Sequence, residues 1–150
     1  MNDKSGLTAI KRTTMSVPMK WLVDNGHVSE SDYGLDYGCG KGFDADALRF
    51  DGWDPNHRPD TPLDEIGYEV VTCNYVLNVI EDPAVRLECE KKVISLLEPT
   101  GRAYLSVRND KKELKGKTSR GTWQGVVEPQ LKGWKLIEEN ARFKVWSYTH

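Results

Sequence analysis

Apolar residues recur along the chain with two spacings, one typical of helices and one typical of buried strands. Ser16 and Pro18 favour a helix start, and the apolar residues after them cover one helix face, so a first helix is predicted at about 16–25. The run 68–74 is apolar and β-branched, which indicates a buried parallel strand. The most regular helical pattern opens at Asp82-Pro83 and is stopped by the Pro-Gly segment 98–101. The other elements are predicted as strand 33–37, helix 43–49, strand 51–54, strand 103–107, a short helix near 124–131, and strands 134–139 and 142–148.

The order of these elements predicts the fold class. Strands and helices alternate until the end of the chain, where two strands are joined by a tight turn at Asn140-Ala141. This order is typical of an α/β sandwich with a mostly parallel sheet, closed here by an antiparallel hairpin. The length of 150 residues fits one domain, 1–150.

One connection is short for a fold of this kind. Residues 55–67, between two predicted parallel strands, contain three prolines and are expected to form a loop. A parallel crossover alone takes about a dozen residues, so these 13 residues leave no room for a further strand with its helix. We therefore expect a minimal Rossmann-like sandwich that lacks one strand at this edge of the sheet.

Composition limits the possible functions. The formal net charge of -2 argues against a nucleic-acid-like charge over the whole protein, although a local basic patch is compatible with it. Three cysteines, an odd number without CxxC spacing, suggest neither a disulfide framework nor a metal site. No apolar run approaches the roughly 20 residues of a membrane span, and no signal-peptide pattern is visible, so a cytoplasmic protein without membrane contact is expected.

A glycine-rich segment follows the strand predicted at 33–37. Gly38, Gly40 and Gly42 lack a Cβ, which lets the backbone bend sharply against a ligand. Nicotinamide and flavin enzymes prefer the spacing GxGxxG, whereas this run is GxGxG with Asp36 before it. Asp54, 18 residues after Asp36, is placed to accept hydrogen bonds from ribose hydroxyls. A plain turn is the alternative, but the pattern resembles the cofactor loop of class I S-adenosylmethionine-dependent methyltransferases.

Three segments together resemble a narrower family. They are LDYGCGKG (Leu35–Gly42), GWDPNHRPD (Gly52–Asp60) and NYVLNVIEDPAVR (Asn74–Arg86). The methyltransferases associated with DNA phosphorothioation systems are similar in joining a DYGCGxG loop to a GWDP segment and a YVLNVIEDP segment. The resemblance implies S-adenosylmethionine as cofactor. This chain departs from those proteins in being much shorter.

The resemblance also implies roles for individual residues. Asp36, Gly38 and Gly40 would border the methionine end of the cofactor. Asp54 would bind the ribose, with Pro55 beside the adenine. The residues assigned to the cofactor are Asp36, Gly38, Cys39, Gly40, Gly42, Asp54, Pro55 and Asn74.

No catalytic acid or base is evident from the sequence. The Asn/Asp-Pro-Pro-aromatic motif of amino-methylating DNA enzymes and the Pro-Cys nucleophile of cytosine C5 enzymes are both absent. The resemblance implies that the floor of the pocket between cofactor and acceptor is formed by Cys73, Asn74 and Tyr75. Asn74 and Tyr75 are therefore candidates for a catalytic role, and His57 is a third candidate because it is the histidine nearest the predicted pocket. Turn and cap chemistry explains Asn74 and Asn78 equally well, and an ordinary loop position explains His57.

A basic segment follows the strand predicted at 103–107. Residues 108–120 contain six basic side chains against two acidic ones, and an aromatic residue lies just beyond. This combination suits phosphate contact with base stacking, and a solvated loop is the alternative. The residues assigned to the substrate are Arg108, Lys111, Lys112, Lys115 and Trp123.

Three functions fit these patterns. The first is an S-adenosylmethionine-dependent methyltransferase that binds DNA or RNA through residues 108–120, with DNA favoured by the resemblance. The second is a methyltransferase that acts on a small molecule or a protein. The third is a non-catalytic S-adenosylmethionine-binding accessory protein, which the missing strand and missing catalytic motif favour. The absence of a recognition domain also suggests a homo-oligomer or a partner subunit.

Overall fold

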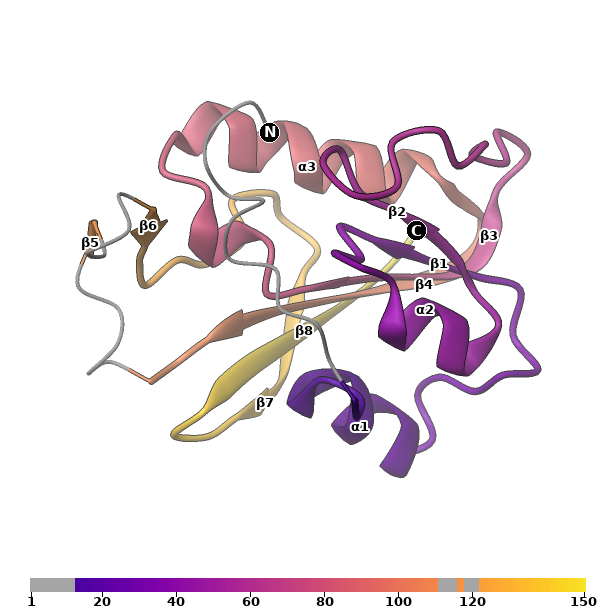
Figure 1. Ribbon diagram of the computed structural model, residues 1–150, viewed down its shortest axis with the longest axis horizontal. Coiled ribbons are helices and arrows are strands. Elements are labelled where there is room, and N and C mark those ends of the chain that lie inside the picture. Colours follow the sequence, from indigo (N-terminus) through magenta and orange to yellow (C-terminus); the bar gives the residue numbers. More distant parts are fainter. Residues whose placement is uncertain (1–12, 111–115, 118–121) are drawn as a thin grey trace.

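A six-stranded sheet forms the centre of the computed structural model, which describes residues 13–110, 116–117 and 122–150 (Figure 1). The strand order is β2-β1-β3-β4-β8-β7. The first four of these strands are parallel, and β8 is antiparallel to both of its neighbours. This mostly parallel sheet with a C-terminal antiparallel pair confirms the predicted fold class. The strands are β1 (Gly34–Tyr37), β2 (Asp51–Trp53), β3 (Tyr68–Asn74), β4 (Leu97–Arg108), β7 (Lys135–Glu139) and β8 (Phe143–Thr149).

Helices cover both faces of the sheet, with α1 and α2 on one side and α3 on the other (Figure 1). A 3₁₀ turn, η2, precedes α3, and a separate pair of two-residue strands, β5 and β6, lies in the connection after β4. Among the described residues, no helix has the length and apolar character that a membrane crossing requires. The bounds of these elements are α1 (Val17–Asp24), α2 (Phe43–Leu48), η2 (Leu77–Val79), α3 (Pro83–Ser95), β5 (Gly116–Lys117) and β6 (Trp123–Gln124).

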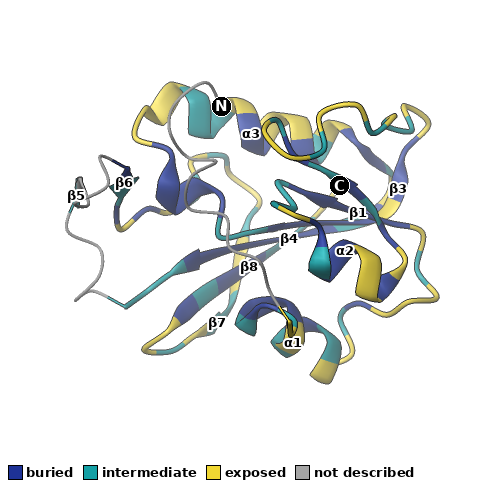
Figure 2. Ribbon diagram, in the orientation of Figure 1, coloured by how far each residue is buried: buried dark blue, intermediate teal, exposed yellow. Residues whose placement is uncertain are grey.

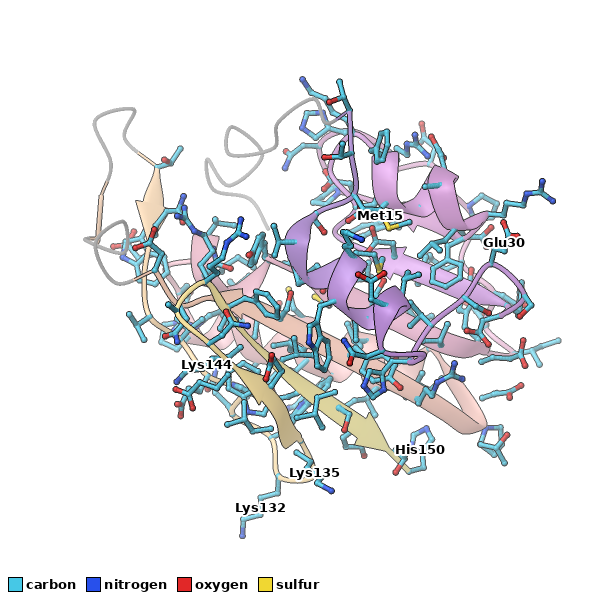
Figure 3. The ribbon with its side chains drawn as sticks, turned by 90° about the horizontal axis from the view of Figure 1, so that it is seen from below. Met15, Glu30, Lys132, Lys135, Lys144 and His150 are labelled. Atoms are coloured by element: carbon cyan, nitrogen blue, oxygen red, sulfur yellow. The ribbon has the colours of Figure 1, made fainter. Side chains whose placement is uncertain are left out.

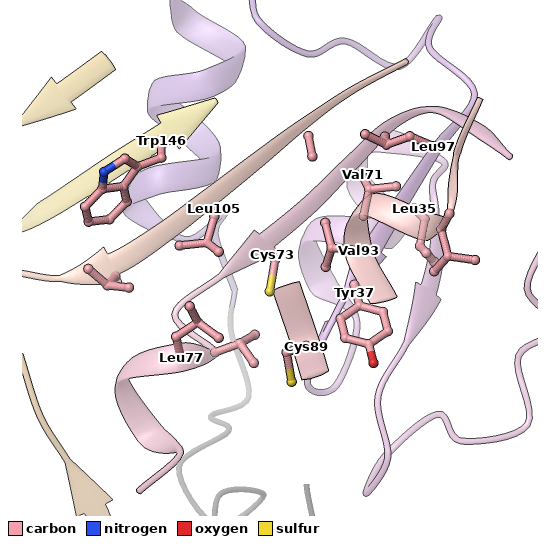
Figure 4. Close-up of a cluster of buried hydrophobic side chains, with 14 of the residues drawn as sticks. Leu35, Tyr37, Val71, Cys73, Leu77, Cys89, Val93, Leu97, Leu105 and Trp146 are labelled. Carbon is pink, nitrogen blue, oxygen red and sulfur yellow. The ribbon is translucent and has the colours of Figure 1, made fainter. Parts of the chain in front are cut away.

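The sheet separates two hydrophobic clusters because successive residues of a strand point to opposite faces. In β3, Val71 and Cys73 pack on the side of α3, whereas Val70 packs on the side of α1 and α2. Figure 4 shows the first cluster, in which Val93 of α3 lies over Val71 and Cys73. The buried residues accordingly concentrate in the central strands, and the exposed ones on the outer faces of the helices (Figure 2).

The connection between β2 and β3 covers one edge of the sheet without adding a strand. Residues 54–67 are all described, and their strand-like contact is limited to one isolated bridge. The Thr61 hydroxyl donates a hydrogen bond to Gly52 O (2.7 Å), and the Trp53 indole N–H donates one to Pro59 O (3.3 Å). The first of these bonds engages a backbone carbonyl that an edge strand otherwise presents to other chains. The predicted loss of one edge strand is confirmed.

The opposite edge strand, β7, is protected by charge. Lys135 is exposed at its start, and Lys144 on the neighbouring β8 lies 3.6 Å from Glu139 and 3.4 Å from Glu128. Figure 3 shows Lys135 and Lys144 on these two strands. Charged side chains along an edge strand oppose pairing with a further strand.

The helix predicted near 124–131 is wrong. Residues 125–130 have no regular structure. The backbone N–H groups of Gln130 and Leu131 donate instead to the Glu90 carboxylate of α3, at 2.8–3.0 Å. A buried charged acceptor on another element therefore replaces the helical acceptors, and a glycine and a proline within the segment also disfavour a helix.

Two predicted boundaries also differ from the structure. The fourth parallel strand was expected at 103–107, but β4 begins at Leu97, passes through the Pro-Gly segment 98–101 and ends at Arg108. A register shift near the start of β3 accommodates this extension. The hairpin turn between β7 and β8 takes three residues, 140–142, and not the expected two.

We expect the Glu90 carboxylate to be a main anchor of the connection after β6. Glu90 is 1% exposed, and Glu90→Gln would replace charge-assisted hydrogen bonds to two backbone N–H groups by weaker neutral ones. The free energy of unfolding should fall by about 2 kcal/mol, as measured by urea denaturation. Glu88→Gln, an exposed change on the same helix, is the control and should alter it by less than about 0.5 kcal/mol. Equal stability of the Glu90→Gln variant and the unchanged protein would contradict the anchoring role.

Candidate cofactor site

The glycine loop connects β1 to α2 and depends on left-handed backbone. Gly38 has φ +79° and Gly42 has φ +91°. A Cβ at Gly38 would overlap Val76 Cγ2, and a Cβ at Gly42 would overlap the guanidinium of Arg58. Neither the conformation nor the space admits a larger residue without strain. The loop lies at the carboxyl edge of the parallel strands, where α/β proteins bind ligands.

Hydrogen bonds tie this loop to the end of β2. The N–H groups of Gly38 and Cys39 both donate to Trp53 O, at 2.7 and 3.0 Å. The N–H of Gly40 donates to Asp54 Oδ2 at 2.9 Å. The loop is therefore held in one conformation by the last carbonyl of β2, Trp53 O, and by the side chain of Asp54, the next residue.

Asp54 also holds the turn that follows it. Its Oδ1 accepts hydrogen bonds from Asn56 N (2.9 Å) and His57 N (3.0 Å), and its side chain is 7% exposed. Pro55, the residue assigned to adenine, lies half-buried inside the same turn. A carboxylate has about four acceptor positions, so Asp54 retains one for a ligand hydroxyl while it fixes Gly40 and the turn.

Arg58 clamps the outer side of the loop. Its guanidinium makes two parallel hydrogen bonds to the Asp46 carboxylate (2.8 and 2.9 Å) and a third to Lys41 O (2.9 Å). The hydrogen bond from Arg58 lowers the pKa of Asp46. Neither residue was predicted, because a single sequence contains no signal that pairs a loop arginine with an aspartate on a short helix.

Three nearly buried carboxylates surround the loop. Asp36 is 3% exposed, and Asp44 and Asp54 are each 7% exposed. Asp36 Oδ1 accepts from the Thr72 hydroxyl (2.9 Å), and Asp44 accepts from both the N–H (2.9 Å) and the hydroxyl (2.6 Å) of Ser16. Within the described residues, none of the three is paired with a Lys or Arg side chain. Buried carboxylates without a cationic partner suit a cationic ligand.

Burial changes the protonation of this site. It raises the pKa of Asp36 to about 8; the Asp44 and Asp54 carboxylates act in the same direction, and the hydrogen bond from Thr72 acts against it. Asp36 is therefore mostly neutral at pH 7, and a nearby cation would favour its ionised form. Burial, with Asp36 and Asp54 nearby, also raises the pKa of the Cys39 thiol to about 12, so this cysteine stays protonated. The described part of the chain holds no cluster of three His, Cys, Asp or Glu residues suited to a metal ion.

The catalytic candidates lie in two places. Asn74 and Tyr75 stand at the carboxyl end of β3, where Asn74 Oδ1 accepts from the Ser106 hydroxyl (2.7 Å) and its Nδ2 contacts Met19 Sδ (3.6 Å). Tyr75 has φ +59°, which is uncommon for a residue with a side chain and is often found at functional sites. His57 is exposed in the turn after β2, so β1 separates it from the other two.

Two of the residues assigned to the substrate are described. Arg108, the last residue of β4, lies 3.4 Å from Gln124 Oε1 and 3.9 Å from the Asp110 carboxylate. Trp123 lies beneath the guanidinium of Arg86, with 5.5 Å from the guanidinium carbon to the ring centroid. The other three lie outside the described residues: Lys111, Lys112 and Lys115.

The fold is shared with known S-adenosylmethionine-dependent methyltransferases. The 1,6-didemethyltoxoflavin-N1-methyltransferase of Burkholderia thailandensis, solved with 1,6-didemethyltoxoflavin and S-adenosylhomocysteine, is 16% identical over 99% of this chain and 80% of its own, with a TM-score of 0.63. The N-methyltransferase NodS of Bradyrhizobium japonicum, solved with S-adenosylhomocysteine, is 12% identical over 87% of this chain and 84% of its own, with a TM-score of 0.58.

A third structure extends the comparison. A methyltransferase of the same cofactor class from Aquifex aeolicus is 11% identical over 97% of this chain and 92% of its own, with a TM-score of 0.60. The sequence matches no protein-family model and no curated protein. At these identities the likeness establishes the fold: this chain has the α/β fold of class I S-adenosylmethionine-dependent methyltransferases.

The raised pKa of Asp36 predicts a pH dependence of stability. The folded protein keeps this proton up to about pH 8, whereas an unfolded aspartate releases it near pH 4. Since the folded state binds more protons between these values, the contribution of Asp36 is fully present below about pH 4 and is lost as the pH rises through 8. Asp36→Asn should remove this loss and make the variant more stable at pH 9, by an amount of the order of a few kcal/mol.

Unfolding free energies from pH 5 to 9 measure this effect. The side-chain amide that Asp36→Asn introduces keeps an oxygen that can accept from Thr72, so the substitution isolates the charge. Asp60→Asn, an exposed change in the connection after β2, is the control and should leave the pH profile unchanged. Parallel profiles for the Asp36→Asn variant and the unchanged protein would refute the assignment.

Proposed function

We propose that this protein is an S-adenosylmethionine-dependent methyltransferase that acts on nucleic acid, with DNA favoured by the sequence resemblance. The observation that supports it most is the glycine loop surrounded by Asp36, Asp44 and Asp54, three nearly buried carboxylates that no described Lys or Arg side chain pairs. S-adenosylmethionine has an α-ammonium group and a sulfonium centre, so it brings positive charge to such a site. The structural neighbours solved with S-adenosylhomocysteine support the same choice of ligand.

The residues present fit this cofactor. Gly38 and Gly42 let the loop turn in left-handed backbone close against Val76 and Arg58, and Asp36 has a carboxyl group that a nearby cation would ionise. Asp54 would hold one ribose hydroxyl with the acceptor position that Gly40 and the following turn leave free. Pro55, in that turn, would border the adenine. The remaining assigned residues, Cys39 and Asn74, lie at the adjoining ends of β1 and β3.

The chemistry asks little more of the protein than alignment. When bound, S-adenosylmethionine supplies a methyl group already activated by its sulfonium. The chain's contribution is to hold donor and acceptor close and in line, which accounts for a large part of such rate accelerations. Asp36 would release its proton to solvent as the cationic ligand binds. Asn74 and Tyr75, at the carboxyl end of β3, would face the acceptor, with Asn74 held in place by Ser106.

Two other functions have specific support. A small-molecule acceptor is favoured by the Burkholderia thailandensis neighbour, which was solved with 1,6-didemethyltoxoflavin bound. A non-catalytic binding protein is favoured by the short connection after β2 and by Asp54, whose carboxylate already accepts three backbone hydrogen bonds. A cytoplasmic location, self-association and a partner subunit remain parts of the proposal.

Cofactor binding should be pH-dependent in a way that identifies Asp36. Ionised Asp36 attracts the α-ammonium group, which S-adenosylhomocysteine keeps although it lacks the sulfonium, and the pKa of Asp36 is about 8. Affinity for S-adenosylhomocysteine should therefore rise by up to about tenfold per pH unit between pH 6 and 8. Isothermal titration calorimetry measures this. Asp36→Asn should weaken binding at pH 8 and abolish the pH dependence, and Asp54→Ala should weaken binding at every pH. Asp60→Asn serves as the exposed control. If the folded protein gives no binding heat at all the pH values tested, the cofactor assignment is wrong.

Transfer of a radiolabelled methyl group should identify the acceptor class. We expect label in DNA when DNA, transfer RNA, a small-molecule extract and cell protein are offered separately. Reversal of Lys111, Lys112 and Lys115 to Glu should lower both DNA binding and transfer by at least about tenfold, since phosphate contacts dominate such affinity. The matched control reverses three exposed lysines elsewhere in the sequence: Lys91, Lys132 and Lys135. Label in the small-molecule extract alone would favour the second function, and binding without transfer the third.

A further inference from the structure

A polar cluster lies beyond the carboxyl ends of β3 and β4. The proposed function does not yet explain why its residues lie together. Asn78 lies in η2, Arg108 ends β4 and Gln124 ends β6. Asn78 Nδ2 and an Arg108 guanidinium nitrogen each lie 3.4 Å from Gln124 Oε1. Three separate elements therefore meet at one side-chain amide.

Asn78 is the unusual member of this cluster. It is 1% exposed, and its Oδ1 is buried with no hydrogen-bond partner among the residues that the structure describes. Its backbone is fixed as well, because Asn78 O accepts from Gly125 N at 2.9 Å. Nearly all buried polar groups in proteins are hydrogen-bonded. A buried carbonyl oxygen held beside other polar groups but left unpaired is therefore suited to accept an N–H from a ligand.

An aromatic surface adjoins the cluster. Trp123, which precedes Gln124, is half-buried, and a Cβ at Gly125 would overlap its ring. Arg86 lies over this ring, and its guanidinium donates to Ile80 O (2.5 Å) and Glu81 O (2.9 Å). The indole of Trp123 is thus held between Arg86, which the backbone after η2 fixes, and the backbone at Gly125. Aromatic side chains with nearby arginines are typical platforms for stacked bases.

We propose that Asn78, Gln124, Arg108 and Trp123 recognise the heterocyclic ring of the methyl acceptor, which is a nucleobase. A base N–H would be donated to Asn78 Oδ1. Base acceptor atoms would take hydrogen bonds from the Gln124 amide and the Arg108 guanidinium, and the ring would stack against Trp123. Each base combines N–H donors, acceptors and a flat ring, and side-chain amides recognise such edges. This inference rests on the proposed function and names the acceptor site within it.

The test measures base binding separately from cofactor binding. Protein saturated with S-adenosylhomocysteine is titrated with adenosine, guanosine, cytidine and thymidine by ligand-observed NMR, and with a 12-nucleotide single-stranded DNA of mixed sequence by fluorescence anisotropy. At least one probe should bind, and Gln124→Ala and Asn78→Leu should each weaken that binding at least tenfold. Gln130→Ala, a matched change elsewhere in the same connection, should leave it unaltered. Binding of nucleosides indicates recognition of a free base, and binding of the oligonucleotide alone indicates a base within a strand.

The outcomes separate this inference from the cofactor proposal. Each variant is also titrated with S-adenosylhomocysteine by calorimetry, which should give unchanged affinity. If the cofactor binds but no probe does, or if the Gln124→Ala variant binds the probes like the unchanged protein, the inference is wrong and the cofactor proposal stands. If the cofactor itself does not bind, the same probe titrations without it decide the inference alone. Gln124 is half-exposed, so its variant decides the question even if the Asn78→Leu variant does not fold.

Discussion

The candidate site depends on the hydrogen bonds that the Asp54 carboxylate accepts from the backbone. One of its oxygens binds the Gly40 N–H, and the other binds two N–H groups of the turn after β2. Glycines have the largest conformational freedom to lose on folding, so a glycine-rich loop needs such anchors to keep one shape. Arg58 adds a second anchor from the outside, through Asp46 and Lys41 O. The conformation of the glycine loop is therefore fixed by the protein's own hydrogen bonds.

The same region explains how the sheet ends at β2. The connection to β3 returns across the edge, where the Tyr68 hydroxyl donates to Asp51 (2.7 Å) and accepts from Asp64 N (3.1 Å), and Thr61 binds Gly52 O. The Thr61 hydroxyl thus binds a carbonyl of β2 that a further strand would bind through its backbone. A ligand held at the carboxyl end of β1 would be bordered here by the turn 54–58, which is a smaller wall than a strand and helix.

The elements that the sequence predicted correctly are those with local signals. The glycine loop, the apolar run of β3 and the short connection after β2 each depend on neighbouring residues, and each is found in the structure. The helix near 124–131 was predicted wrongly because its competitor, Glu90, lies 40 residues before Gln130.

In the candidate site, long-range features escaped prediction in the same way. The Arg58–Asp46 pair joins two elements, and the pKa of Asp36 is set by burial and by Asp44 and Asp54, which only the folded chain brings close. The side-chain oxygen of Asn78, which has no partner in the described part of the chain, is likewise a property of packing, since the residue by itself fits a turn or a cap equally well. Sequence patterns could therefore locate the site, but they could not describe its electrostatics.

The contact between Ser16 and Asp44 restricts which substitutions this fold can accept. Ser16 donates both its N–H and its hydroxyl to Asp44, so the residue at the N-terminal boundary of α1 hydrogen-bonds a buried carboxylate of α2. Loss of the serine hydroxyl alone would leave a buried carboxyl group short of a donor, and loss of the aspartate alone would leave two donors without an acceptor. Each change is tolerable mainly when the other accompanies it. The two positions should therefore be inherited as a pair, and α1 cannot be exchanged for the first helix of a relative unless the matching α2 comes with it.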